Sequence, residues 1–401
     1  GQSLTLGEII MIAKQNTVSY LNWIKFILLG DPALKLAYPE NKVSALTINN
    51  TSIEISTDTL KALSNVSITG EVTDPLSYPL HKFNGTVTTT IFDKVSLIKT
   101  KANDPESKPT TFALRKNIIY KGLSEVKNGK FYMNFIVPKV IEYKIDEGKI
   151  CFYACSDKDD AAGYFAPVYV GGINTNAQID NTPPSIHLFM NDLNFKDGGI
   201  TDENPVLLAF ISDENGINTV GSGIGHDIVA ILDNNSNNPL ILNNYYKSDL
   251  NTYTSGSIAY PLFNLEEGDH EIRLTAWDVY NNSATSKLKF TVKNSASFII
   301  SNLYNYPNPF YDKTYFVFEH NKSSEEMQVE IRIMDIYGRV VKTIAHTIFF
   351  TGYCSQPIEW DGASDNGKRL SQGIYIYQLT LTDSKGNARQ KSGKLMISKN
   401  Q

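Results

Sequence analysis

From Lys42 to the C-terminus the sequence consists of short runs rich in β-branched and aromatic residues, separated by Asn, Asp, Gly, Ser and Pro. Runs such as "FNGTVTTTIFDKV" and "HEIRLTAWD" alternate apolar and polar side chains. A period of two places one set of side chains on each face of a strand, and the intervening residues are those that turns require. This pattern predicts a succession of short strands in β-sandwich domains.

The strand-like runs fall into three blocks, at residues 42–175, 183–293 and 298–401. The polar stretch "GGINTNAQIDNTPPSI", with its pair of prolines, reads as a linker between the first two. Each block has the size of an immunoglobulin-like sandwich, about 100 residues or slightly more. A chain of 401 residues is also too long for one ordinary core. We therefore predict a mainly β protein made of tandem immunoglobulin-like β-sandwich domains.

Residues 1–41 have a different pattern of apolar and polar residues. Thr5 precedes Glu8 in "TLGEIIMIAKQN", which is the spacing of a helix capping box. The run "WIKFILLGDPALKLAYP" then predicts a nearly continuous apolar strand and a second short strand. A helix beside such a strand predicts a short α/β remnant, the end of a larger α/β domain. We expect its apolar side chains to pack on the first sandwich, because they are too many to leave in water.

The charge of the chain argues against a polyanionic partner. The net charge is −5 and the pI is near 5.8, whereas nucleic-acid binding needs clustered Lys and Arg. No apolar run approaches the roughly 18 residues of a membrane span. Gly1-Gln2 leads into the first helix without a basic region or a small-residue cleavage site, so we expect no signal peptide in this chain.

The usual catalytic arrangements are missing from the sequence. Cys151 and Cys155 lie in one predicted strand, where four residue steps separate their Cα atoms by about 13 Å. That separation exceeds the limit of about 7 Å for a disulfide. Cys354 is remote, and the six histidines show no metal-ligand spacing. We therefore predict free, structural cysteines and no catalytic residue in this chain.

The glycine-rich stretch "TVGSGIGHDIVAILD" at residues 219–233 is the most unusual motif. Its spacing and the strand-like run that follows do not fit a dinucleotide-binding turn or a nucleophile elbow. We expect a structural loop in which Gly223 and Gly225 have positive φ angles. His226 and Asp227 are then expected to be hydrogen bonded locally.

A calcium site near the same loop is the alternative. Oxygen donors surround it in the sequence, and Ca²⁺ binds such donors. Asp- and Asn-rich loops are also ordinary turn chemistry, so both interpretations stay open. The candidate ligands are Asp213, Glu214, Asn215, Asp227 and Asp233.

Three segments resemble one family. "KFILLGDPALKLAYP" is similar to the close of the catalytic α/β domain in gingipain-like cysteine peptidases of family C25. "ENGINTVGSGIGHDIVAILD" resembles the post-catalytic region of the type IX secretion sortases of Bacteroidetes within that family. The last block resembles the FlgD-like, type IX C-terminal domain. The matching residues there include Pro307, Asn308, Pro309, Gly338, Gly373, Tyr375 and Lys394.

The resemblance implies accessory β-domains of an exported cysteine peptidase and sortase at the cell surface or outer membrane. It implies partners among type IX secretion or outer-membrane proteins and the signal domains of cargo. The family's catalytic Cys and His precede the "LLGDPAL" segment, so none is carried over and no cofactor other than calcium is expected. The alternative is a non-enzymatic surface adhesin or binding protein built of immunoglobulin-like domains.

Overall fold

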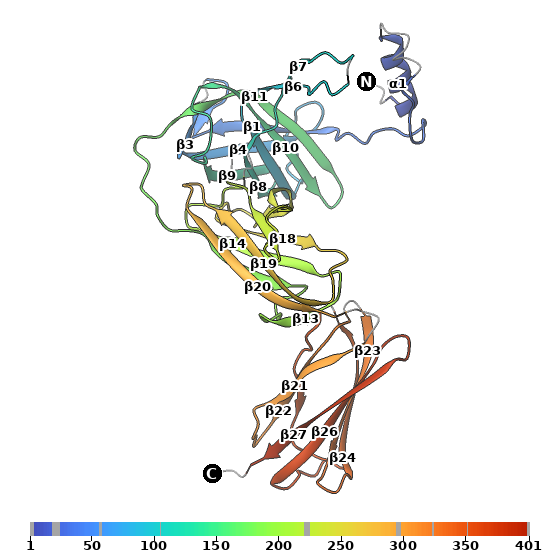
Figure 1. The fold of residues 1–401 in the computed structure, drawn as a ribbon. Helices are drawn as coiled ribbons and strands as arrows, with labels where there is room; N and C mark the ends of the chain where they lie inside the picture. The colour runs from blue at the N-terminus through green and yellow to red at the C-terminus, as the bar shows by residue number, and fades with distance from the viewer. Residues whose placement is uncertain are drawn as a thin grey trace.

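The computed structural model describes residues 4–17, 25–55, 58–104, 106–219, 225–293, 298–322, 325–350 and 352–398. Within these residues the chain is mainly β, and three β-domains follow one another from the N-terminus to the C-terminus (Figure 1). The predicted fold class, mainly β with tandem β-domains, is confirmed, and the second and third domains are two-sheet sandwiches. Each domain has its own buried apolar cluster.

The first domain is a sheet that closes on itself. Its strands follow the order β2-β1-β4-β9-β8-β5-β10-β11-β3, and β1 also pairs in parallel with β11. A Cβ at Gly163 would lie 1.9 Å from the Val43 carbonyl oxygen, so this close approach requires glycine. The strands are β1 (Asn41–Ile48), β2 (Thr51–Ser52), β3 (Leu60–Ala62), β4 (Asn65–Thr73), β5 (Gly85–Phe92), β6 (Ser96–Lys99), β7 (Thr111–Leu114), β8 (Ile118–Lys127), β9 (Lys130–Ile136), β10 (Asp146–Ser156) and β11 (Asp160–Ile173).

Alternation along β10 shows how the first core is filled. Ile150, Phe152 and Ala154 are buried, whereas Cys151 and Cys155 lie on the outer face. All three cysteines are free, as the strand spacing predicts.

The second domain is a sandwich of two sheets, with strand orders β12-β14-β18-β17 and β13-β20-β19-β15-β16. A short 3₁₀ helix, η1 (Asn243–Tyr245), precedes β17. The strands are β12 (Ser185–Met190), β13 (Gly199–Thr201), β14 (Val206–Ser212), β15 (Val229–Leu232), β16 (Leu240–Ile241), β17 (Tyr246–Ser248), β18 (Ser255–Pro261), β19 (Gly268–Trp277) and β20 (Ser283–Val292).

The third domain pairs a sheet of order β21-β22-β25 with one of order β24-β23-β26-β27. Val329, Ile331 and Ile333 are buried, as are Tyr377 and Leu379, so each of these two strands turns one alternating set of side chains inward. The strands are β21 (Ile300–Tyr306), β22 (Thr314–His320), β23 (Glu325–Met334), β24 (Val340–Phe350), β25 (Ile358–Trp360), β26 (Gly373–Thr382) and β27 (Ala388–Ile397).

The first helix forms where the capping box predicts it. In α1 (Leu6–Gln15) the Glu8 amide donates to the Thr5 hydroxyl oxygen, and the Thr5 amide donates to the Glu8 carboxylate. The strand expected after it is wrong for residues 25–29, where the structure has no strand and Phe26 is 64% exposed. A strand needs hydrogen-bond partners for its backbone, and the described chain supplies none there.

The expected packing of this segment on the first sandwich is also wrong. Helix α1 has no buried residue, and Leu29 is 88% exposed. The backbone contacts of the segment are internal, from the Leu6 amide to the Leu34 carbonyl and from the Gly7 amide to the Pro32 carbonyl. The apolar residues Trp23 and Ile24 lie outside the described residues.

A strand edge joins the first two domains. β8 pairs with β5 along nearly its whole length, but with β9 only near Val126. The second domain covers the edge that β9 leaves. The Leu123 amide donates to the Ser248 hydroxyl (3.0 Å), and the Glu125 amide donates to the Asn251 side-chain oxygen (2.7 Å). The Asn251 amide in turn donates to the Leu123 carbonyl (2.9 Å).

Candidate functional site

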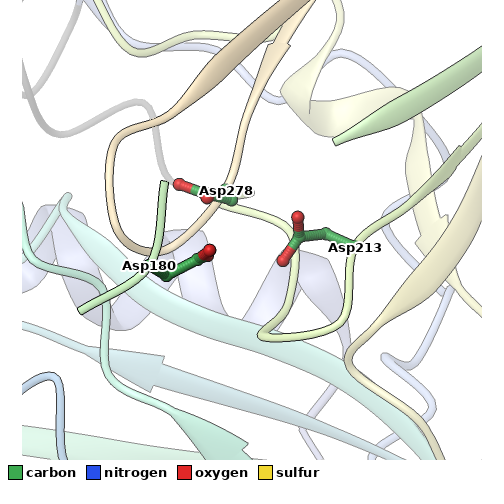
Figure 2. Close-up of side chains that lie close together, drawn as sticks. All are labelled: Asp180, Asp213 and Asp278. Carbon is green, nitrogen blue, oxygen red and sulfur yellow. The ribbon is translucent and has the colours of Figure 1, made fainter. Parts of the chain in front are cut away.

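Three carboxylates meet where the linker enters the second domain. Asp180 lies on the linker, Asp213 directly follows β14, and Asp278 directly follows β19. One carboxylate oxygen from each lies within 4.8 Å of the other two, and Figure 2 shows the three side chains converging. Asp278 is fully buried and Asp213 is 8% exposed, so water screens their charges poorly.

Each carboxylate is held by the backbone of its own turn. Asp213 Oδ1 accepts hydrogen bonds from the amides of Asn215 (2.8 Å) and Gly216 (3.0 Å). Asp278 Oδ1 accepts from the amides of Tyr280 (2.9 Å) and Asn282 (2.7 Å). These turns fix where the carboxylates of Asp213 and Asp278 point.

The linker carboxylate is tied to the other two turns. Asp180 Oδ1 accepts from the Thr182 amide (2.9 Å), and the Asn282 side-chain amide donates to the Asp180 carbonyl (3.2 Å). Asp180 Oδ2 is buried without a hydrogen-bond partner among the described residues. The cluster therefore contains one oxygen that the surrounding protein leaves unsatisfied.

Burial makes the three charges hard to accommodate together. It raises the pKa of Asp213 to about 6, and the charges of Asp278 and Asp180 act in the same direction. Burial also raises the pKa of Asp278. For Asp180 burial again disfavours the charge, but hydrogen bonds from Thr182 and Asn215 outweigh it and hold the pKa below its ordinary value. A proton or a cation would relieve the repulsion.

The structure assembles only part of the predicted calcium set. Asp213 belongs to the carboxylate cluster, and the backbone amide of Asn215 donates to its carboxylate. Asp233 instead contacts His270, with 2.7 Å between Oδ2 and Nδ1. Asp227 lines a separate polar cleft of about 350 Å³. The sequence alone did not single out Asp180 or Asp278, because their proximity depends on the linker's path across the second domain.

The glycine-rich loop is described only from Gly225 onward, and Gly223 lies outside the described residues. Gly225 has a φ of +89°, which agrees with the expected left-handed conformation. His226 packs edge-on against Trp277, with 4.5 Å between ring centroids. Its Nδ1 is buried and has no hydrogen-bond partner among the described residues, so the expected pairing with Asp227 is not seen.

Asn243 holds the two ends of this loop together. Its side-chain oxygen accepts from the Ile228 amide (3.1 Å), and its side-chain nitrogen donates to the Thr219 carbonyl (3.2 Å). Sequence reasoning missed this residue, since nothing in "ILNNYY" indicates a partner in another segment. These two hydrogen bonds support a structural role for the described ends of the loop.

In the third domain, Asn308 of the "YPNPF" motif binds the last strand. Its side-chain nitrogen donates to the Lys394 carbonyl (3.0 Å), and its side-chain oxygen accepts from the Met396 amide (2.9 Å). The Phe310 amide then donates to the Met396 carbonyl (3.0 Å). The flanking Pro307 and Pro309 lack backbone donors, so the asparagine side chain replaces the main chain as the partner of β27.

The other predicted motif residues stabilise turns of this domain. Gly338 has a φ of +80° in the turn between β23 and β24. The Tyr375 hydroxyl donates to the Ser371 carbonyl (2.9 Å), just before Gly373 opens β26. Lys394 is exposed, and its side chain forms no ion pair within the described part of the chain.

Comparison with known proteins agrees with these motifs. Residues 304–397 match the family described as the secretion system C-terminal sorting domain. The solved structure of dimeric latent PorU from Porphyromonas gingivalis is 33% identical, over 98% of this chain and 38% of that chain, with a TM-score of 0.42.

This sequence matches a PorU-like protein. The two matches associate it with type IX secretion, and the sorting domain implies export to the cell surface. The PorU-like chain spans 38% of the length of the PorU it matches. No curated protein matches it.

Two further solved structures share only a low sequence identity with this chain. A tetra-tandem repeat from the extending region of a large adhesion protein is 13% identical, over 90% of this chain and 74% of that one, with a TM-score of 0.20. The Bacteroides ovatus glucan-locus protein SGBP-B, solved with a heptasaccharide, is 13% identical, over 89% and 70%, with a TM-score of 0.26. Neither carries a functional argument for the PorU-like chain.

Replacing Asp213 with Asn tests the electrostatic repulsion among the three carboxylates of the cluster. The pKa of Asp213 is about 6 in the folded chain and 3.8 ordinarily, so the folded state holds its proton more tightly between these pH values. Stability should therefore fall as the pH rises through this window, by up to about 3 kcal/mol for this group. D213N should weaken that slope and raise the Tm at pH 7.5, whereas D227N, outside the cluster, should not. If the stability of wild type and of D213N changed with pH in the same way, this prediction would be contradicted.

Calcium binding at the Asp213 loop stays a prediction. If a cation neutralises the cluster, millimolar Ca²⁺ should raise the Tm of the wild-type chain at pH 7.5, because binding to the folded state alone stabilises it. The D213N variant should lose most of that increase, and D227N should keep it. Equal melting curves of wild type in Ca²⁺ and in chelator would exclude the site under these conditions.

Proposed function

We propose that this chain forms the accessory, post-catalytic β-domains of a gingipain-like, family C25 cysteine peptidase and sortase that processes type IX secretion cargo. The observation that carries the proposal is the 33% identity to PorU over 98% of the chain, together with the sorting domain at residues 304–397. The chain itself supplies structure and recognition, and the chemistry belongs to an α/β domain that precedes it.

The exposed N-terminal segment supports an α/β partner. Helix α1 buries none of its residues, and Phe26, Ile27 and Leu29 are 64%, 71% and 88% exposed. Such side chains gain about 1.5–3 kcal/mol each when they are buried. An α/β domain that packs against α1 and residues 25–29 would bury them.

The contacts of the cysteines support the assignment of catalysis outside this chain. Cys155 Sγ lies 3.6 Å from the Thr86 hydroxyl, and Cys354 Sγ lies 3.7 Å from the Ser355 carbonyl. Burial raises the pKa of Cys354, which disfavours the nucleophilic thiolate. No hydrogen bond between a cysteine and a histidine occurs in the described ranges, so the activation that a cysteine peptidase needs is not seen there.

The partners that fit this role are type IX secretion proteins, other outer-membrane proteins and the signal domains of cargo. The sorting domain supports contact with the secretion machinery. Among the described residues, no helix has the length and apolar character needed to cross a membrane. We propose that outer-membrane attachment depends on protein partners. The related PorU structure is described as dimeric, so self-association is part of the same proposal.

A non-enzymatic adhesin or binding protein is the second candidate, since three sandwiches in a row suit a surface-binding protein equally well. The complete parent protein distinguishes the two candidates. The sortase proposal requires a Cys and a His, each at the end of a strand in an upstream α/β domain. The adhesin proposal requires neither.

The proposal predicts that this chain has no peptidase activity while the complete parent protein has it. Both are assayed on Arg-, Lys- and signal-type peptides, with and without a thiol reductant. The chain should show no turnover above buffer, because its thiols lack a histidine base. Turnover by the chain that disappears in Cys151→Ala or Cys155→Ala would overturn the assignment. A parent protein that is inactive under all conditions would favour the adhesin.

A further inference from the structure

The third domain exposes apolar side chains at one end of its larger sheet. This set, called here the distal apolar patch, lies at the end of β26 and β27 where the chain terminates, and Figure 1 places that terminus away from the second domain. The exposed fractions run from 37% for Ile376 to 79% for Tyr337. The patch consists of Ile336, Tyr337, Val340, Ile374, Ile376 and Met396.

The strand register makes the patch continuous. Met334 pairs with Val340 on one side and with Ile376 on the other. Ile374 pairs with Met396 on the neighbouring strand. Side chains of directly paired residues lie on the same face of a sheet, so the patch crosses all four strands on the outer face. Elsewhere on this face the strands carry mostly polar residues such as Arg332, Gln378 and Thr380.

The turn that presents Ile336 and Tyr337 is held in one conformation. Asp335 Oδ1 accepts from the amides of Tyr337 (2.9 Å) and Arg339 (3.0 Å). Its Oδ2 accepts from the Arg339 guanidinium (2.8 Å), and this interaction helps hold the pKa of Asp335 below its ordinary value. A turn fixed before binding loses little entropy when a partner binds it.

The charged side chains beside the patch indicate which charge a binding partner would carry. Arg332 pairs with Glu330, Arg339 with Asp335, and Lys342 with Asp365. Lys394 pairs with Ile376 across the sheet and forms no ion pair among the residues that the structure describes.

The backbone around Lys394 is fixed at the same time. Its carbonyl and the Met396 amide are bound by Asn308, so the strand that carries Lys394 is held at the edge of the patch. An uncompensated ammonium group beside apolar side chains is complementary to a carboxylate on an apolar surface.

The outer face of the smaller sheet lacks this combination of an apolar patch and a lysine without an ion pair among the described residues. Its lysine, Lys313, is paired with Glu359 (3.0 Å), and Asn302 donates to Glu319 (2.7 Å). Tyr304 on β21 is contacted by Lys196 of the second domain, 5.9 Å from the ring centroid. Of the two outer faces, the larger sheet therefore has the better-defined docking surface.

We propose that the distal apolar patch is the surface through which the sorting domain docks on a protein partner, and that the partner places apolar side chains around a carboxylate that pairs with Lys394. The inference rests on the proposed role in type IX secretion and names the recognition surface within it. Buried aliphatic and aromatic anchors next to one charge pair are the usual centre of a specific interface.

The test follows the fraction of the full-length protein that reaches the cell surface in a Bacteroidetes host with a type IX system. Ile374→Thr/Ile376→Thr and Lys394→Glu should each lower that fraction about tenfold or more, whereas Lys394→Arg should retain it. The matched control is Phe349→Thr, which removes a 61% exposed side chain at the other end of the same outer face and should leave export unchanged. Melting curves of the purified variants exclude loss of folding as the cause.

Deletion of residues 298–398 separates this inference from the proposed function. If the deletion abolishes surface delivery but the patch variants are exported normally, the patch assignment is wrong and the sorting role stands. If the deletion has no effect, the sorting role itself fails. If Lys394→Glu is exported as well as Lys394→Arg, the proposed carboxylate is contradicted.

A photo-crosslinking residue identifies what covers the patch. Placed at position 376, it should crosslink to a different protein in the exporting cells, and placed at position 349 it should not. Crosslinks at 376 to lipid alone would assign the patch to a membrane surface and overturn the proposal. Crosslinks to a second copy of this chain would assign it to self-association and overturn it equally.

Discussion

The free edge of β8 is the constraint on which the arrangement of the first two domains depends. β8 and β9 pair only near Val126, so the amides of Leu123 and Glu125 need partners elsewhere. Ser248 and Asn251 of the second domain provide them. Satisfying a strand edge with a neighbouring domain also protects it from aggregation, which is a general hazard of exposed edges.

The linker that follows the first domain is also held against the second domain. The linker crosses the second domain close to the turns after β14 and β19, and this path brings Asp180 to Asp213 and Asp278. The cluster is therefore a property of the linker and the second domain together, and its charge links the stability of that domain to pH and to any bound cation. The third domain lies beyond this unit, where its distal face is free to meet a partner (Figure 1).

Local patterns predicted much of the fold because they depend on neighbouring residues. The capping box at Thr5 and Glu8, the alternation of side chains along the strands, and the free cysteines of β10 all follow from spacing along the chain. The sorting-domain motif was also recognisable, since it consists of short local patterns such as "YPNPF". The apolar run at residues 25–29 was misjudged because strand formation needs a partner as well as a pattern.

The candidate site was only partly predictable. Asp213 was identified from its Asp- and Asn-rich turn, but Asp180 and Asp278 join it through tertiary contacts that no local pattern reports. The same holds for Asn243, which closes the glycine-rich loop, and for Asn308, whose role requires the last strand to lie beside it. Polar side chains that bridge distant segments become recognisable only when the path of the chain is known.

Amide hydrogen exchange at Leu123 and Glu125 tests most directly whether the first two domains form one unit. If the second domain covers the edge of β8, both amides should exchange as slowly as those in the centre of β5, and Asn251→Ala should accelerate Glu125 in particular. If both amides in the unmodified chain exchange as fast as those of exposed loops, the junction is not formed in solution, and the account of the first two domains as one unit is contradicted.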